Sequence, residues 1–508
     1  MQVHEEFKRV VERVVSAGWQ LSTDAFELVQ ASGTRLDQDK LADELIAAAR
    51  KQPTGQRLID RNLVEQVLNH LLPPAQTIRI SEPIRAGGPV AAQIESELKV
   101  LKDPSNASIF GGSMQDFTLH FRDRFVKMRE ILRRRSDAKD AGTISNALNA
   151  QQNEHVKFIA MIMEKREREN RLFLAVDDLE DTAQVLVQTD RDRQLYEMAL
   201  RAPLDQVVCI EAVKSSRSLL VAERITLPDI PERRPRGAKE EVYAALLSDV
   251  HVGSKKFLED AFRRAIRWLN GEVGNPQQVY VAQRTKYVIV AGDLVDGIGV
   301  YPRQEDELSI GDIYEQYKSV AKFFEQIPDH IEVIVVPGDH DAARQALPQP
   351  AIPKEFAEPL YEARPITWLG NPSEVEIHGV RFLVHHGRSL VDLLTSAPGM
   401  SFEKPERAMK LQLQCRHLAP EYGNRTSIAP MPVDQLVIDE PPDVFHSGHI
   451  HIFGHEQYRG TLIVNSGAWQ AQTEYQQRMG LVPTPGLLPV VNLQTLKLSV
   501  TNFLSTGG

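Results

Sequence analysis

The stretch VYAALLSDVHVG, residues 242–253, decides how the second half of this chain is interpreted. An apolar run typical of a buried parallel strand ends abruptly in Asp249 and His251. The stretch KYVIVAGDLVDG (286–297) repeats the pattern and brings Asp293 to the end of a second strand. Buried strands have no packing reason to end in carboxylate and imidazole, whereas ligands of α/β folds bind beyond the carboxyl ends of the strands. The sequence therefore predicts an α/β domain with a functional site at that edge.

Three further segments extend this pattern in order along the chain: EVIVVPGDHDAAR (332–344), RFLVHHGRS (381–389) and DVFHSGHIHIFG (443–454). Their polar residues at the strand ends are Asp339, His340, Asp341, His385, His386, His449 and His451. Asp-x-His and His-x-His place two side chains on one side of an extended chain, because side chains repeat every second residue. Neutral imidazole and carboxylate suit Mn²⁺, Fe, Co or Zn²⁺ without any thiolate. Five ordered motifs therefore predict a metal centre.

Composition narrows the classes of protein that remain. The 508 residues exceed one hydrophobic core, so several domains are expected. The two cysteines, Cys209 and Cys415, lie too far apart in sequence to build a zinc cluster or a disulfide framework. No apolar run has the roughly 20 residues needed to cross a bilayer, and MQVHEEFKRVVERVV at the start lacks a secretory core. We expect a cytoplasmic protein without membrane contact.

The rest of the chain divides by pattern into a multidomain arrangement. Residues 1–72 predict a small helical domain, whose role in docking, DNA contact or plain packing stays open. Residues 73–115 are rich in Pro and Gly and predict a flexible linker. Residues 116–230 predict a basic helix followed by an OB-type β-barrel, and residues 240–508 form the metal-binding domain. The last apolar alternation, GLLPVVNLQTLKLSVTNFL, predicts closing strands in the core or a contact with a partner.

The region 116–230 carries the basic residues expected of a nucleic-acid contact. The helix DFTLHFRDRFVKMREILRRR either contacts phosphates or exposes a solvated basic face. The barrel offers only Phe158 and Phe173 as aromatic stacking candidates, and both fit a core equally well. A structural or subunit-contact barrel is therefore favoured over an independent DNA binder. A net charge of −10 requires any positive surface to be local or supplied by a partner.

The five motifs together resemble the signature of calcineurin-like metallophosphoesterases, which implies a β-sandwich with flanking helices. Longer stretches resemble the small subunits of archaeal family D DNA polymerases. These stretches are LLSDVHVGSKKF, VVPGDHDAARQALPQP, VHHGRSLVDL, RHLAPEYG and PDVFHSGHIHIFG. The resemblance covers essentially the whole chain and is strongest over residues 240–480. It implies a metal-dependent 3′–5′ exonuclease that proofreads DNA at single-stranded or mismatched 3′ ends.

The resemblance also implies a role for each motif residue. Asp249, His251 and His451 would bind one divalent ion, and Asp339, His386 and His449 the other. Asp293 would bridge the two ions, with Mn²⁺ favoured over Fe, Co, Zn²⁺ or Mg²⁺. His340, helped by Asp341, would face the scissile phosphate as a catalytic residue, and His385 would not be a ligand. The family has Asn where this chain has Asp339, so an additional negative charge lies beside the ions and repels substrate by about 1–4 kcal/mol.

Two arginines beside the motifs, Arg344 and Arg388, are candidates for binding substrate phosphate bidentately, or for pairing and packing roles. The resemblance implies a heterodimer with a large catalytic polymerase subunit, nucleoid association, and contact with a sliding clamp through that complex. Two alternatives stay open. The first is a phosphoesterase for another phosphate ester, and the second is a silent scaffold subunit whose site has decayed.

Overall fold

The protein is described by a computed structural model that divides into two compact units, residues 1–85 and residues 86–508. The described residues are 3–22, 25, 26, 29, 38–50, 57–60, 63, 64, 67, 88–107, 109, 111–169, 171–189, 192–216 and 218–504. The division falls within the expected linker, whose residues 73–87 lie outside the described ones. The other domain limits stay predictions. The structure is a multidomain α/β protein with several sheets.

The first unit is built on helices, as the apolar period of its sequence predicts. Its elements are α1 (Val3–Ser16), α3 (Gln38–Ala49), β1 (Gln20–Leu21) and β2 (Leu58–Ile59). Val10 and Val14 of α1 pack with Leu41 and Leu45 of α3 in one buried cluster. The two short strands pair in parallel, a feature that the helical expectation did not include.

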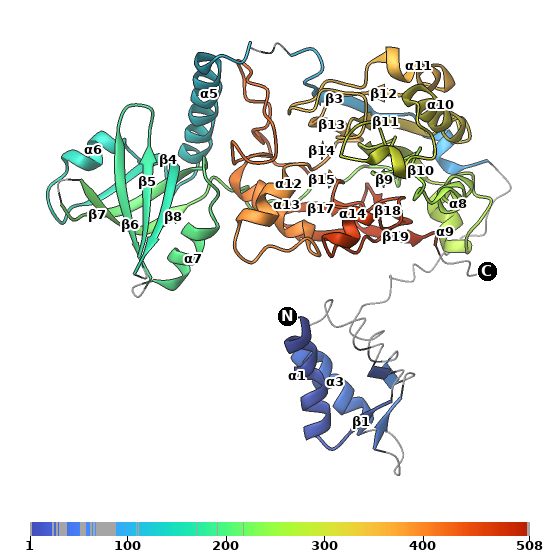
Figure 1. The fold of residues 1–508 in the computed structure, drawn as a ribbon, viewed down its shortest axis with the longest axis horizontal. Helices are drawn as coiled ribbons and strands as arrows, with labels where there is room; N and C mark the ends of the chain where they lie inside the picture. Colours follow the sequence, from blue (N-terminus) through green and yellow to red (C-terminus); the bar gives the residue numbers. More distant parts are fainter. Residues whose placement is uncertain are drawn as a thin grey trace. The chain divides into compact units, whose positions relative to one another are not determined.

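The second unit contains a β-sandwich of two six-stranded sheets among the described residues (Figure 1). The first sheet has the order β12-β11-β10-β9-β18-β19, and the second has the order β16-β17-β15-β14-β13-β3. The strands of the first sheet are β9 (Tyr243–Leu247), β10 (Thr285–Ala291), β11 (Glu332–Val336), β12 (Thr367–Trp368), β18 (Leu487–Asn492) and β19 (Leu498–Asn502). Those of the second are β3 (Leu98–Lys102), β13 (Ser373–Ile377), β14 (Val380–Val384), β15 (Val444–Ser447), β16 (Gly454–Tyr458) and β17 (Thr461–Asn465).

Alternation along the strands produces a layered core. Ala244 and Leu246 of β9 face the second sheet, where they meet Phe382 and Val464, while Ala245 and Leu247 face the helices. Helices flank both sheets of the sandwich. They are α8 (Glu259–Leu269), α9 (Pro276–Ala282), α10 (Ile313–Phe324), α11 (Lys354–Ala363), α12 (Leu390–Ser396), α13 (Pro405–Cys415) and the short α14 (Glu474–Arg478). Two short 3₁₀ helices are η1 (Val90–Gln93) and η2 (Gln304–Glu307).

The linker expected over residues 73–115 is wrong for its second part. Strand β3 pairs antiparallel with β13 and completes the edge of the second sheet. Its sequence, LKVLK, lies between Pro and Gly residues and is too short to show a period of two, so the sequence showed no sign of a strand. The strand forms because it pairs with a strand that is distant in sequence. The C-terminal alternation instead behaves as expected of closing strands, because β18 pairs with β9 and buries Val490 and Val491.

Between β3 and β9 in sequence, the chain forms a closed barrel with the strand order β4-β5-β6-β8-β7. Its strands are β4 (His155–Arg168), β5 (Arg171–Asp177), β6 (Thr182–Gln188), β7 (Val207–Lys214) and β8 (Leu219–Thr226), with α5 (Met114–Arg133), α6 (Ile144–Asn149) and α7 (Arg193–Arg201) beside them. Helix α7 lies between the third and fourth strands of the barrel in sequence. Phe158 is fully buried in the barrel core, so it is not available for base stacking, whereas Phe173 is partly buried.

Helix α5 uses its most central arginine inside the protein. Arg124 is 1% exposed, and its Nε donates to Asp434 Oδ2 at 2.8 Å. The same carboxylate lies 3.0 Å from His417 Nε2, and Asp434 Oδ1 accepts from the Leu436 amide. His417 and Arg124 lower the pKa of Asp434 against the opposing effect of burial. Part of the basic charge that the sequence assigned either to phosphate contact or to a solvated face therefore holds the helix onto the sandwich domain.

We expect Asp434→Ala to lower the free energy of unfolding by about 3–5 kcal/mol, because it leaves Arg124 charged, buried and without its carboxylate. Thermal unfolding followed by circular dichroism measures this effect. The matched control is Asp439→Ala, whose side chain is 51% exposed and lies 3.5 Å from Lys102 Nζ. A surface pair of this kind contributes about 1 kcal/mol or less. Equal losses in both variants would contradict a special role for the buried cluster.

Among the residues that the structure describes, no helix is both long and apolar enough to span a membrane.

Candidate metal centre

The donor side chains lie on loops that directly follow strands of both sheets. Asp249, Asp293 and Asp339 follow β9, β10 and β11, which run parallel to one another. His386 follows β14, and the pair His449 and His451 follows β15, which is parallel to β14. Because parallel strands end at the same edge of a sheet, the carboxyl ends of both sheets bring their loops together. The sequence prediction placed the site at this edge.

One group of donors gathers around Asp249. His451 Nε2 lies 3.3 Å from Asp249 Oδ1 and 3.1 Å from His251 Nε2. His251 Nε2 lies 3.9 Å from the same carboxylate oxygen. These three side chains are buried, and one atom from each lies within 4.8 Å of the others. Their spacing is that of a possible three-ligand metal site.

A second group lies next to the first. His386 Nε2 is 3.2 Å from Asp293 Oδ2 and 3.2 Å from His449 Nδ1. Asp339 Oδ2 is 3.5 Å from His449 Nδ1, which adds a second carboxylate to this group. Asp293 Oδ2 is also 3.7 Å from His251 Nε2 of the first group. Asp293 therefore lies between the groups, as expected of a bridging ligand.

The backbone at the donors is strained. Asp249, His251, Asp293, His449 and His451 all have positive φ angles, between 52° and 67°. Such left-handed conformations are uncommon for residues other than glycine and cost of order 1–3 kcal/mol each, and they cluster at functional sites. Glycine makes the close approach possible, because a Cβ on Gly448 would stand 2.4 Å from Asp249 Oδ2. The strained backbone and the glycine at 448 both allow the loops to approach one another closely at this point.

Burial lowers the pKa of the histidines at the site, whereas neighbouring carboxylates raise it. Burial lowers the pKa of His449 to about 4, so its ring is neutral and can donate a lone pair. Burial also lowers the pKa of His386, but the adjacent Asp293 carboxylate outweighs it and raises that pKa well above the ordinary value. A cation that binds here must displace the proton on His386, and its affinity therefore depends on pH.

His340 lies at the edge of the donors, where its ring meets His251 edge to face at 4.6 Å. Its Nδ1 lies 2.6 Å from the carbonyl oxygen of Asp296, and because a carbonyl only accepts, Nδ1 donates. Burial lowers the pKa of His340, but Asp293 and Asp296 outweigh it and raise that pKa. The ring can thus carry a proton on Nε2 near neutral pH.

Asp296 is a site residue that sequence reasoning missed. Its Oδ1 lies 3.1 Å from His251 Nδ1 and accepts from Gln470 Nε2 at 2.9 Å. A carboxylate on Nδ1 fixes the ring so that Nε2 faces the other donors, as in many metal sites. Asp296 is the second aspartate of KYVIVAGDLVDG, three residues after Asp293. It was missed because the prediction considered only residues at the ends of strands, and Asp296 lies further into the loop.

Asp341 does not contact the His340 ring, which corrects the expected catalytic role. Its Oδ2 accepts from the amides of Asp293 at 2.8 Å and Gly338 at 2.9 Å. Its Oδ1 accepts from the Tyr317 hydroxyl at 3.2 Å. Burial and the nearby Asp293 carboxylate raise the pKa of Asp341 to about 6. Asp341 therefore joins two site loops and is a positioning residue.

His385 lies apart from the donors, in agreement with its exclusion from the predicted ligands. Its Nδ1 lies 2.9 Å from Asn371 Oδ1, and its Nε2 lies 3.1 Å from Ser389 Oγ. Burial lowers the pKa of His385 to about 3. The side chain is a neutral part of the core beneath the loop that carries His386.

The two arginines predicted to bind phosphate differ in position. Arg388 lines the cavity beside the donors, and its Nε lies 3.7 Å from Asp339 Oδ2. Arg344 is not among the cavity-lining side chains, because its guanidinium donates to the carbonyls of Ala346 and Pro348. The structure therefore does not bring Arg344 to the place where a phosphate contact was expected. Arg425 lines the cavity instead and is exposed, and no sequence motif marked it.

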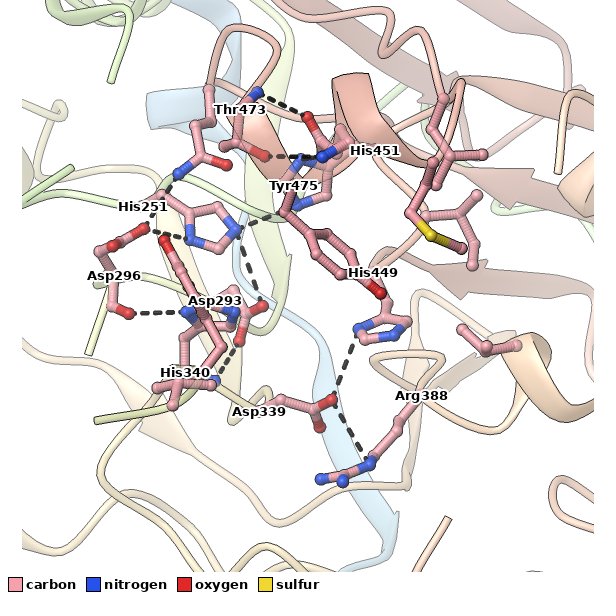
Figure 2. Close-up of a pocket in the computed structure, with 18 of the residues that line it drawn as sticks. His251, Asp293, Asp296, Asp339, His340, Arg388, His449, His451, Thr473 and Tyr475 are labelled. Carbon is pink, nitrogen blue, oxygen red and sulfur yellow. Dashed lines mark hydrogen bonds and ion pairs between the residues drawn. The ribbon is translucent and has the colours of Figure 1, made fainter. Parts of the chain in front are cut away.

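A cavity of about 380 Å³ lies beside the donors and is lined by His251, Asp293, Asp339, His449 and His451 (Figure 2). Its other sides are formed by loops between strands and by α14. The polar residues converge on one region, while aromatic and aliphatic side chains line the rest. The cavity can hold a small charged group beside a larger apolar one.

Comparison with known proteins places the chain in a family. The model of the family described as the B subunits of DNA polymerases alpha and epsilon matches residues 244–454. The DNA polymerase II small subunit of Archaeoglobus fulgidus is 38% identical over 483 residues, which cover 95% of each chain. That of Pyrococcus furiosus is 42% identical over 380 residues, which cover 74% of this chain and 62% of the relative, so the match spans less than two thirds of that relative.

A solved structure described as a novel archaeal phosphodiesterase is 17% identical, covers 51% of this chain and 99% of its own, and has a TM-score of 0.26. The relatives that align over nearly the whole chain decide the family. The A. fulgidus protein aligns over 95% of its own length and 95% of this chain. This chain belongs to the family of DNA polymerase II small subunits, the small subunits of the archaeal family D DNA polymerases.

Proposed function

We propose that this chain is a metal-dependent 3′–5′ DNA exonuclease that removes nucleotides from unpaired 3′ ends by phosphodiester hydrolysis. The observation that carries the proposal is the convergence of donors from five loops into two groups that share Asp293. A scaffold subunit would not need to keep so many strained, buried, chemically matched side chains together.

The residues fit a pair of divalent ions. Asp249, His251 and His451 would hold one ion, and Asp339, His386 and His449 the other, with Asp293 between them. Asp339 Oδ1 is buried and has no hydrogen-bond partner in the structure, as expected of an oxygen that a cation satisfies. Nitrogen and oxygen donors without thiolate favour Mn²⁺, and Fe, Co, Zn²⁺ or Mg²⁺ can also be bound. Two such ions supply Lewis acidity toward the phosphate and lower the pKa of a bound water.

The chain's own residues would position and protonate the substrate. His340, fixed through Nδ1 by the Asp296 carbonyl, would present Nε2–H to the scissile phosphate and protonate the leaving 3′-oxygen. Arg388 and the exposed Arg425 would bind the phosphate oxygens of the strand. Asp341 would keep the loops of Asp293 and His340 in register through its backbone hydrogen bonds.

The proofreading role would be carried out beside a large catalytic subunit that performs synthesis. We assign the barrel to the OB type, because its helix lies between the third and fourth strands and its strand order is 1-2-3-5-4. With Phe158 buried in its core, this barrel would serve subunit contact more than base stacking. Contact with a sliding clamp would be made through the complex.

The decisive test compares the wild-type chain with Asp339→Asn on an end-labelled oligonucleotide carrying an unpaired 3′ end, with and without Mn²⁺. We expect shortening from the 3′ end only with Mn²⁺, and a kcat/KM about 5–10-fold higher in Asp339→Asn at saturating Mn²⁺. The increase follows because the substitution removes a negative charge beside the phosphate, which is worth about 1 kcal/mol or more. It also releases Arg388, which lies 3.7 Å from this carboxylate.

Asp439→Asn, which makes the same change on the surface, is the control. Hydrolysis of p-nitrophenyl phosphate without any shortening of DNA would point to another phosphate ester as substrate. Absence of both activities, with no metal bound by the purified chain, would leave only the scaffold role.

A further inference from the structure

The cavity beside the donors has an apolar wall that metal-dependent hydrolysis alone does not require. Val300 and Tyr301 line it on the loop after β10, and Tyr475, Met479 and Leu481 line it on and after α14. Phosphate, metal and water would all contact the polar donors. The wall therefore indicates a substrate group that is flat or apolar and lies next to the phosphate.

Large side chains on this wall are unusually exposed. Tyr475 is 55% exposed and Met479 is 51% exposed, although both lie at the cavity. Figure 2 shows Tyr475 drawn among the donor side chains, near His449 and His451. Exposed apolar side chains concentrated at a concave site mark a binding surface more often than chance exposure.

The α14 segment is braced against the donors. Thr473 and Gln476 form a reciprocal capping box at the start of the helix. Gln476 Nε2 lies 2.9 Å from His451 Nδ1, and Gln472 Nε2 donates to the Leu481 carbonyl at 2.7 Å. The Thr484 amide donates to the His451 carbonyl at 2.9 Å. A wall tied to a donor in this way holds Tyr475 at a set distance from the phosphate position.

A second tyrosine, Tyr301, also lines the cavity. The Tyr301 ring lies 6.2 Å from the His340 ring, in an edge-to-face arrangement. Burial raises the pKa of Tyr301 well above its ordinary value, with Asp296 and Glu307 adding to the effect, so its hydroxyl stays neutral. The two tyrosines and Met479 thus line the cavity with uncharged side chains.

We infer that this wall is a nucleobase subsite, in which Tyr475 stacks on the base of a nucleotide whose phosphate lies on the donors. The inference rests on the proposed exonuclease function and names the element that selects its substrate. A 3′-terminal base in paired DNA is held by its partner base and by stacking on the neighbouring pair, so a base that has already left the duplex reaches Tyr475 at a lower cost. Base–aromatic stacking is tolerant of sequence and contributes about 1–3 kcal/mol per base. Unpaired 3′ ends are therefore selected by the stacking wall, whatever their sequence.

The test measures binding of a single-stranded oligonucleotide with 2-aminopurine at its 3′ end to the full chain in Mn²⁺. The terminal linkage of the oligonucleotide is a non-hydrolysable analogue, so that the ions stay in place and no hydrolysis occurs. We expect binding to the wild type to quench the 2-aminopurine fluorescence. Tyr475→Ala is expected to bind the strand about 5- to 100-fold more weakly and to lose the quenching. Tyr475→Phe is expected to keep the binding affinity and the fluorescence quenching of the wild type, because its ring still stacks on the base. The matched control is Tyr314→Ala, whose ring is 52% exposed on α10 and is not among the cavity-lining residues.

A second oligonucleotide with an abasic 3′ residue separates stacking from other effects. The wild type should bind it as weakly as Tyr475→Ala binds the normal strand, and Tyr475→Ala should cause no further loss. An equal loss on both strands, or unchanged quenching in Tyr475→Ala, overturns the subsite. Quenching without any Mn²⁺-dependent hydrolysis rejects the exonuclease proposal alone, whereas hydrolysis without quenching rejects the stacking wall alone.

Discussion

His340→Ala is expected to slow 3′-end hydrolysis by about 10²–10⁴-fold while the purified chain keeps its full metal content. The reason is geometric. His340 lies beside the donors, but its Nδ1 is occupied by the Asp296 carbonyl at 2.6 Å. Its substitution therefore removes a proton donor from the leaving oxygen and leaves both groups of ligands in place. Single-turnover rates on an end-labelled strand, together with elemental analysis, measure the two quantities separately.

The control for this prediction is His455→Ala, because His455 is an exposed histidine on β16, outside the cavity-lining residues. It should change neither rate nor metal content. A loss of metal in His340→Ala would show that His340 is a ligand, which the group formed by His251, Asp296 and His340 permits geometrically. An unchanged rate would remove His340 from the mechanism.

The convergence of these side chains was predictable from sequence because each of them follows shortly after an apolar strand. The end of β9, for example, fixes where Asp249 must lie, since parallel strands share the edge at which their loops emerge. The order of the strands in the sheets was not needed to assign these residues to one edge. A residue at a strand end can therefore be assigned to a site before the topology of the fold is known.

Positions inside tight loops were not predictable in the same way. Asp341 and Arg344 lie two and five residues after Asp339, where the chain turns and side-chain direction no longer follows a period of two. Asp341 turns back to the amides of its own loops, and Arg344 turns to nearby carbonyls. Arg124 was misjudged for a related reason: its partner, Asp434, is distant in sequence and has no motif around it.

Asp293→Asn is expected to have the largest effect, with a weaker affinity for metal by about 10³-fold and hydrolysis reduced to background. Asn is nearly isosteric and tolerates the left-handed backbone at φ 56°, so the fold is retained. What is lost is a negative charge between two cations, and a unit charge at about 4 Å is worth about 4 kcal/mol at an effective dielectric of 20. Calorimetric titration with Mn²⁺ measures the affinity, and the nuclease assay measures the rate.

The same substitution tests whether one carboxylate really serves both groups of donors. Asp293 Oδ2 lies 3.2 Å from His386 Nε2 and 3.7 Å from His251 Nε2, so a bridging role predicts that both binding events weaken together. Asp306→Asn, a change at a 65% exposed carboxylate paired with Arg303, should leave both events unchanged. If Asp293→Asn weakened only one of the two events, Asp293 would belong to a single ion. The two groups of donors would then be independent sites, and the proposal that two ions act together on one phosphate would be wrong.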